Sequence, residues 1–184
     1  AYVALIEKWN PKINLVSKSS LPEIWDRHIW DSAQIFDIAV EGSVWADFGS
    51  GGGLPGIVLA IFAKELRPDM QFYLVESDQR KCAFLRNAVR EIGLNVKVHA
   101  ERIEVLDPIG ASVISARALT DLNGLLEFVE RHSAKNGVAI LPKGETWEKE
   151  ILQAQENWSF EYEEITSKTN NDAAILKIKD FARV

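Results

Sequence analysis

The 184-residue chain is predicted to fold as an α/β protein with a seven-stranded, mostly parallel sheet. Three observations predict it. Strand and helix patterns alternate beyond residue 40, a glycine-rich turn joins the first strand to the next helix, and two strand patterns follow one another at the end. Alternation indicates parallel strands, because parallel neighbours need a crossover connection that is usually a helix. We expect a single domain over 1–184, with a helical N-terminal extension over 1–40 and an α/β core over 41–184.

The N-terminal extension opens with an amphipathic helix. Its apolar residues Tyr2, Leu5, Ile6 and Trp9 recur at positions i, i+3, i+4 and i+7, the spacing of one helical face. The chain starts inside this pattern and without Met. We therefore expect some N-terminal residues to be missing.

The core elements follow in order along the chain. Short runs of β-branched and aromatic residues predict strands at 44–48, 71–76, 96–99, 111–115 and 137–141. Helical patterns cover 55–66, 79–92, 121–132 and 146–157. The last two runs, FEYEEITS and AAILKIK, are separated by the turn-forming KTNND. They predict a C-terminal antiparallel hairpin.

The glycine-rich turn is DFGSGGGLPG, residues 47–56. Asp47 to Gly53 matches D-x-G-x-G-x-G between a strand and a helix, which is typical of cofactor-binding loops. Gly51, Gly53 and Gly56 also match G-x-G-x-x-G, the pyrophosphate pattern, so the glycines alone leave NAD open. The Asp47 carboxylate favours a cationic amino-acid ligand over a pyrophosphate. We therefore predict S-adenosylmethionine as the cofactor, with S-adenosylhomocysteine as the product.

Two further side chains stand where the strands of such a sheet end. Glu76 ends the second strand and is expected to bind the ribose hydroxyls, while Asp78 is better placed to cap the next helix. Arg117 follows the fourth strand and offers a planar donor fork suited to carboxylate, phosphate or guanine. An ordinary salt bridge is an equal alternative for Arg117. Cys82 lies on an apolar helix face, which indicates packing and not a nucleophile.

The composition excludes several classes of protein. The net charge of -6 argues against a nonspecific nucleic-acid binder. One cysteine and three scattered histidines show no spacing of metal ligands. No apolar run is long enough to span a membrane, so we expect a soluble, cytoplasmic protein.

The N-terminal extension adds two weaker candidates. Asn14 could bind a base edge through its amide or serve in an Asx-turn, and the turn is favoured. His28 has Asp31 at i+3, which would orient its imidazole, although a structural histidine is favoured.

Several short motifs in a fixed order carry a resemblance to one known family. They are Trp9-Asn10, Asn14-Leu15 with Ser17, Arg27-His28-Ile29 with Asp31-Ser32, the glycine loop, Glu76-Ser77, Arg102 with Glu104, and Ala116-Arg117-Ala118. The chain resembles the glucose-inhibited division protein B family, the ribosomal RNA small-subunit guanine-N7 methyltransferases, from about residue 7 to 144. The resemblance implies a Rossmann-like class I fold and methyl transfer to N7 of a guanine in 16S ribosomal RNA.

The resemblance also implies a set of site residues. Cofactor contacts are expected at Asp47, Gly49, Ser50, Gly51, Gly53, Leu54, Glu76, Ile103, Glu104 and Arg117. Contacts to the guanine or its RNA are expected at Asn14, His28, Arg102 and Arg117. No catalytic side chain is expected, because guanine N7 carries a lone pair and no proton, so proximity suffices.

The expected partner is small-subunit ribosomal RNA or its ribonucleoprotein, and the enzyme is expected to be a monomer. Two alternatives stay open at this point. One is an NAD-dependent oxidoreductase, and the other is a noncatalytic RNA-binding factor in ribosome assembly.

Overall fold

The computed structural model describes residues 1–38 and 42–184. A single seven-stranded sheet forms its centre, in the order β3-β2-β1-β4-β5-β7-β6. The strands are β1 (Val44–Phe48), β2 (Gln71–Val75), β3 (Val96–His99), β4 (Ala111–Ala116), β5 (Ser133–Lys143), β6 (Trp158–Thr166) and β7 (Ala174–Arg183). Strands β1 to β5 run parallel to one another. The predicted α/β class and seven strands are confirmed.

The last strand, β7, lies between β5 and β6 and is antiparallel to both. The predicted terminal hairpin is therefore present, and both of its strands are longer than predicted. Opposite charges face each other across the two strands: Lys179 Nζ lies 2.9 Å from Glu161 Oε2. Cross-strand pairs of this kind stabilise a hairpin. The added length lies at the ends of the two strands, where Trp158 pairs with Arg183 and Ser159 with Ala182.

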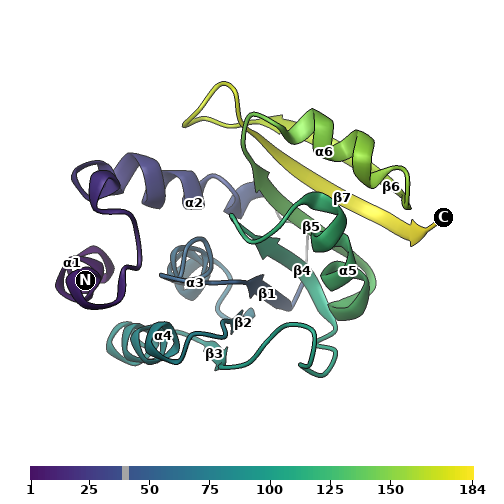
Figure 1. Cartoon of the computed structure of the whole chain (residues 1–184). Helices are drawn as coiled ribbons and strands as arrows, with labels where there is room; N and C mark the ends of the chain where they lie inside the picture. Colours follow the sequence, from purple (N-terminus) through teal and green to yellow (C-terminus); the bar gives the residue numbers. More distant parts are fainter. Residues whose placement is uncertain (39–41) are drawn as a thin grey trace.

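Helices cover both faces of the sheet (Figure 1). On one face, α1 (Tyr2–Ile13), α3 (Gly56–Leu66) and α4 (Gln79–Ile92) share a core that includes the stacked rings of Trp45 and Phe72. On the other face, α5 (Leu122–His132) and α6 (Trp147–Ala154) cover Ala46 and Phe48. Alternate residues of β1 thus enter opposite cores, as the two-residue period of a strand requires.

The N-terminal extension contains short turns after α1. They are η1 (Lys18–Glu23), the single π-helical turn η2 (Trp25–Trp30), α2 (Asp31–Ala33) and η3 (Phe36–Ile38). The predicted boundary between extension and core, at residues 40 and 41, lies outside the described residues. Among the described residues, no helix has the length and apolar character that a membrane crossing requires.

Hydrogen bonds join the extension to the core at places that lie far apart. The Tyr2 hydroxyl donates a hydrogen bond to the carbonyl of Gly52. The Gln34 side chain accepts from the backbone N–H of Lys168 at 2.8 Å and donates to Ser167 Oγ at 3.2 Å. These contacts hold the extension against the glycine loop and against the β6–β7 turn, at the edge of the sheet where the parallel strands end.

Candidate functional site

The glycine loop between β1 and α3 adopts a backbone that other residues disfavour. Gly49, Gly51 and Gly53 have φ values of 62°, 55° and 87°, in the left-handed region that favours glycine. Only Gly49 and Gly51 are partly exposed, and residues 50 and 52–56 are buried. The surface that this loop offers to a ligand is therefore the backbone around Gly49 and Gly51.

The buried glycines are needed because the protein itself approaches them. A Cβ on Gly52 would lie 3.2 Å from Leu15, and one on Gly56 would overlap the Leu74 side chain. A Cβ on Gly51 would meet only the carbonyl oxygen of Gly49, at 3.7 Å. Gly51 thus faces open space, so a ligand can approach the loop backbone at this point.

Asp47 lies beneath the loop and is fully buried. Its carboxylate accepts hydrogen bonds from the Ser115 hydroxyl at 2.7 Å and from the N–H of Gly56 at 3.3 Å. Burial raises the pKa of Asp47 to about 6, although the hydrogen bonds oppose the shift. The carboxylate therefore joins β1, β4 and the start of α3, and a direct contact to the cofactor stays a prediction. Ser50 and Leu54, also predicted as cofactor contacts, are buried as well.

Glu76 holds the exposed part of the loop. Its Oε2 accepts from the N–H of Gly51 at 2.9 Å, and its Oε1 accepts from the N–H of Asp78 at 2.8 Å. Each carboxylate oxygen can accept a second hydrogen bond. Glu76 can therefore fix the loop and still receive the two ribose hydroxyls. Asp78 caps α4, accepting from the N–H groups of Arg80 and Lys81.

A cavity of about 300 Å³ opens beside these residues. Its walls include Gly49 and Glu76 and, from the segment after β3, Arg102, Ile103 and Glu104. This volume is at the lower end of that of small-molecule pockets. The glycine surface, a carboxylate with free acceptor sites and the buried Ile103 side chain fit the nucleoside part of S-adenosylmethionine.

Arg117 connects the end of β4 to the N-terminal extension. Its Nη1 lies 3.1 Å from Asp31 Oδ2, and its Nη2 lies 3.4 Å from His28 Nδ1. Because a guanidinium can only donate, Nδ1 accepts and the ring proton resides on Nε2, which donates to Ser20 Oγ at 2.7 Å. Burial and the charge of Arg117 lower the pKa of His28. The imidazole is therefore neutral and has no free nitrogen for base catalysis.

The structure divides the predicted substrate residues among three places. His28 and Arg117 lie together, whereas Arg102 lines the cofactor cavity. Asn14 is exposed and ends α1 with a φ of 47°, which agrees with the favoured turn reading. The amide of Asn10, which sequence reasoning left without a role, holds this turn by accepting from the N–H of Leu15 at 2.7 Å and of Val16 at 2.9 Å.

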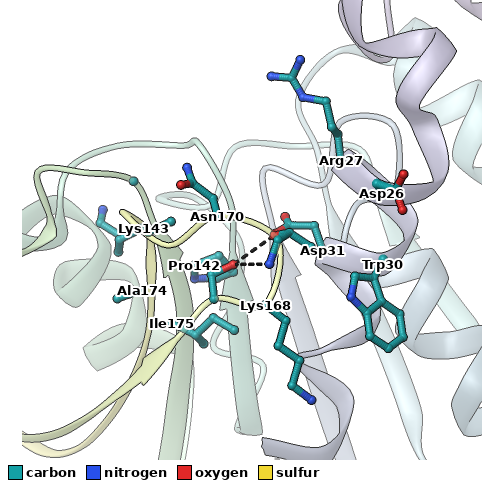
Figure 2. Close-up of a pocket in the computed structure, with 14 residues that line it drawn as sticks. Asp26, Arg27, Trp30, Asp31, Pro142, Lys143, Lys168, Asn170, Ala174 and Ile175 are labelled. Atoms are coloured by element: carbon teal, nitrogen blue, oxygen red, sulfur yellow. Dashed lines mark hydrogen bonds between the residues drawn. The ribbon is translucent and has the colours of Figure 1, made fainter.

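The sequence predicted the turn between β6 and β7 but gave it no role at the site. Thr169 Oγ1 donates to Asp31 Oδ1 at 2.7 Å, so Asp31 joins Arg117 to this turn. A second cavity, of about 470 Å³, lies between η2, the end of β5 and the turn (Figure 2). No local pattern in the sequence could show it, because its walls are more than a hundred residues apart in the chain.

The described part of the chain contains no cluster of side chains suited to a metal ion. No group of three or more His, Cys, Asp or Glu side chains lies close enough to hold an ion among residues 1–38 and 42–184. The lone cysteine, Cys82, is buried and donates through its Sγ to the Glu76 carbonyl at 3.1 Å.

The chain is similar to proteins of one family. A family model described as "rRNA small subunit methyltransferase G" matches residues 1–176. A protein of that name from Ruegeria sp. (strain TM1040) is 57% identical over 98% of this chain and 88% of its own. Another from Paracoccus denitrificans (strain Pd 1222) is 51% identical over 96% of this chain and 91% of its own.

Solved structures show the same fold at low sequence identity. A SAM-dependent methyltransferase from Aquifex aeolicus has a TM-score of 0.65 and 14% identity over 86% of this chain and 92% of its own. M. jannaschii TYW2, solved in complex with AdoMet, has a TM-score of 0.62 and 15% identity over 95% of this chain and 80% of its own. The class I methyltransferase fold is confirmed. The sequence similarity and the fold together favour a methyltransferase over a dinucleotide oxidoreductase, and the chain belongs to the rRNA small subunit methyltransferase G family.

Proposed function

We propose that this chain transfers the methyl group of S-adenosylmethionine to N7 of one guanine in 16S ribosomal RNA. Family membership supports methyl transfer to ribosomal RNA, and the geometry of the site supports N7 as the methylated atom of the guanine. The observation that supports this position is that His28, the imidazole beside Arg117, has no free ring nitrogen to act as a general base, since it accepts from Arg117 and donates to Ser20. Methyl transfer to N7 needs none, because N7 has a lone pair and no proton.

The cofactor is proposed to lie along the exposed backbone of Gly49 and Gly51, with its ribose on Glu76 and its adenine between Ile103 and Glu104. When bound, S-adenosylmethionine supplies an electrophilic methyl group. The remaining predicted cofactor residues support this surface from below: Asp47 fixes the start of α3, and Ser50 Oγ donates to the Asp47 carbonyl at 2.8 Å.

Arg117 is proposed to orient the acceptor. Its side chain is 21% exposed, so part of the guanidinium can donate to guanine O6 or to a phosphate while Asp31 and His28 hold it. Catalysis then consists mainly of placing N7 in line with the methyl group, which can contribute several orders of magnitude.

We further propose that residues 1–184 act as one methyltransferase domain, as a monomer in the cytoplasm. The hydrogen bonds of Tyr2 to Gly52 and of Gln34 to the β6–β7 turn support a single unit. The net charge of -6 supports a folded RNA or ribonucleoprotein substrate that is recognised by shape and not by bulk charge.

The function is tested by mapping the modified nucleotide. Small subunits lacking the modification are incubated with the protein and S-adenosylmethionine, and the RNA is then treated with borohydride and aniline, which cleave at 7-methylguanine. One new cleavage site in 16S RNA is expected. Methylation at N1 or N2, or of a different RNA, contradicts the proposal, and RNA binding without methylation indicates a noncatalytic assembly factor.

A further inference from the structure

The cavity between η2 and the β6–β7 turn and the cofactor cavity are both lined by residues that adjoin Arg117. Ala118 and Leu119, which follow Arg117, line the cofactor cavity, whereas Asp31, its ion-pair partner, lines the second one. Lys143 and Gly144 place the second cavity at the carboxyl end of β5. In open α/β sheets, ligands bind at this edge. A group bound here would lie beside Asp31, the ion-pair partner of Arg117.

The cavity is held open by hydrogen bonds between distant segments. Asp31 Oδ1 accepts from Thr169 Oγ1 at 2.7 Å and from Gln34 Nε2 at 3.0 Å. Lys143 Nζ lies 2.6 Å from Glu150 Oε2 and is largely buried. Both walls are therefore fixed before any ligand binds, and the cavity is a preformed site of about 470 Å³.

The wall formed by η2 carries an aromatic ring and a carboxylate one helical turn apart (Figure 2). Trp30 lines the cavity with 52% of its surface exposed. Asp26, four residues earlier, also lines it and is exposed. Among residues 1–38 and 42–184, the Asp26 carboxylate forms no hydrogen bond or ion pair, although the backbone of Asp26 is part of η2. An exposed indole beside an unpaired carboxylate can stack on a base and accept from its N–H groups.

The chemistry of guanine matches this pair. N7 lies on the five-membered ring, so the opposite edge, with N1–H and the N2 amino group, faces away from the methyl donor. These two adjacent donors suit one carboxylate, whereas adenine presents an acceptor at N1 and would be repelled. A carboxylate is therefore the side chain that selects guanine while leaving N7 free.

We propose that this cavity binds the acceptor guanosine of the RNA, unstacked from its neighbours, with the base on Trp30 and its Watson–Crick edge on Asp26. Lys168 is exposed at the rim and available to a phosphate. The inference rests on the proposed function, and it adds the residues that hold and select the base.

The stacking is tested with matched tryptophan variants. Trp25 is 64% exposed on the same turn but does not line the cavity. Trp30→Ala should lower kcat/KM for methylation of small subunits roughly 5- to 150-fold, the range for loss of one aromatic–base stack. Trp30→Phe should restore most of it, and Trp25→Ala should stay within about threefold of the wild type. S-adenosylmethionine affinity, measured by calorimetry, should be the same in all variants and reports that each is folded.

The selection is tested with subunits reconstituted to carry guanosine or inosine at the methylated position. Inosine lacks the N2 amino group and keeps N7. The wild type should prefer guanosine roughly 5- to 150-fold, and Asp26→Asn should reduce this preference below about threefold. Glu23→Gln, on an exposed side chain outside the cavity, is the control and should keep the preference.

Two outcomes overturn the inference: equal activity of Trp30→Ala and Trp25→Ala, or an unchanged guanosine preference in Asp26→Asn. Both are read against wild-type protein that methylates guanine N7. If the wild-type protein does not methylate guanine N7, the proposed function itself fails. That result differs from either outcome above, because both require an active wild-type protein.

Discussion

Gly51 provides the sharpest test of the cofactor surface. A glycine that contacts the cofactor and a glycine that only allows the loop conformation predict different results for Gly51→Ala. The φ of 55° would cost an alanine roughly 1–2 kcal/mol of folding free energy. Its Cβ would have room, since it would meet only the Gly49 carbonyl at 3.7 Å. The methyl group would, however, stand in the space assigned to the cofactor. S-adenosylmethionine affinity should therefore fall at least about tenfold, equivalent to 1.4 kcal/mol.

Variants of two other glycines distinguish a loss of cofactor affinity from a loss of folding stability. Gly110 has a φ of 69° and nothing within 4 Å of an added Cβ, and it precedes β4 at the opposite edge of the sheet. Gly110→Ala should have the same folding cost and leave cofactor affinity unchanged. Gly56→Ala would overlap Leu74 and approach Asp47 Oδ2 to 2.8 Å, so it should lower the free energy of unfolding by roughly 1–3 kcal/mol.

Urea denaturation measures the stabilities, and calorimetric titration with S-adenosylmethionine measures the affinities. If Gly51→Ala binds the cofactor as tightly as Gly110→Ala does, the exposed backbone of this loop is not the cofactor surface. The glycines would then serve only the packing of Leu15 and Leu74 against the loop.

Three further variants test the site. Arg117→Ala should lower kcat/KM for methylation roughly 10- to 150-fold through loss of charged hydrogen bonds; wild-type turnover would remove Arg117 from the site. Glu76→Gln should weaken S-adenosylmethionine binding about tenfold, because the substitution replaces one accepting oxygen with an NH2 donor; unchanged calorimetric affinity would contradict ribose binding. Burial raises the pKa of Asp47 from 3.8 to about 6. Between these pH values the folded state therefore binds more protons than the unfolded state. The free energy of unfolding should fall as the pH rises through this range, by about 3 kcal/mol in total. In urea titrations, Asp47→Asn should lose this slope, and a slope that persists would refute it.

The sequence was sufficient for the fold because each core element has a local signal. Alternation gave the five parallel strands, and the carboxylate of Asp78 marked the start of α4. The glycine pattern marked the loop, but it could not separate the exposed Gly51 from the buried Gly53 and Gly56. That distinction depends on Leu15 and Leu74, which approach from other parts of the chain.

The residues proposed to hold the guanine were less predictable from the sequence, again because their contacts come from distant parts of the chain. His28 and Arg117 were identified singly, and only the fold brings them to 3.4 Å. Asp31 was noted for its spacing to His28, whereas its bonds to Arg117 and Thr169 span 86 and 138 residues. The motifs that carry the resemblance end before about residue 144, yet the turn of the terminal hairpin forms one wall of the second cavity.

The most direct test of the central claim is the identity of the methylated nucleoside. Small subunits are incubated with the protein and isotopically labelled S-adenosylmethionine, and the RNA is digested to nucleosides and analysed by mass spectrometry. One labelled 7-methylguanosine per subunit is expected. Label in another nucleoside, or none in RNA, would contradict the claim.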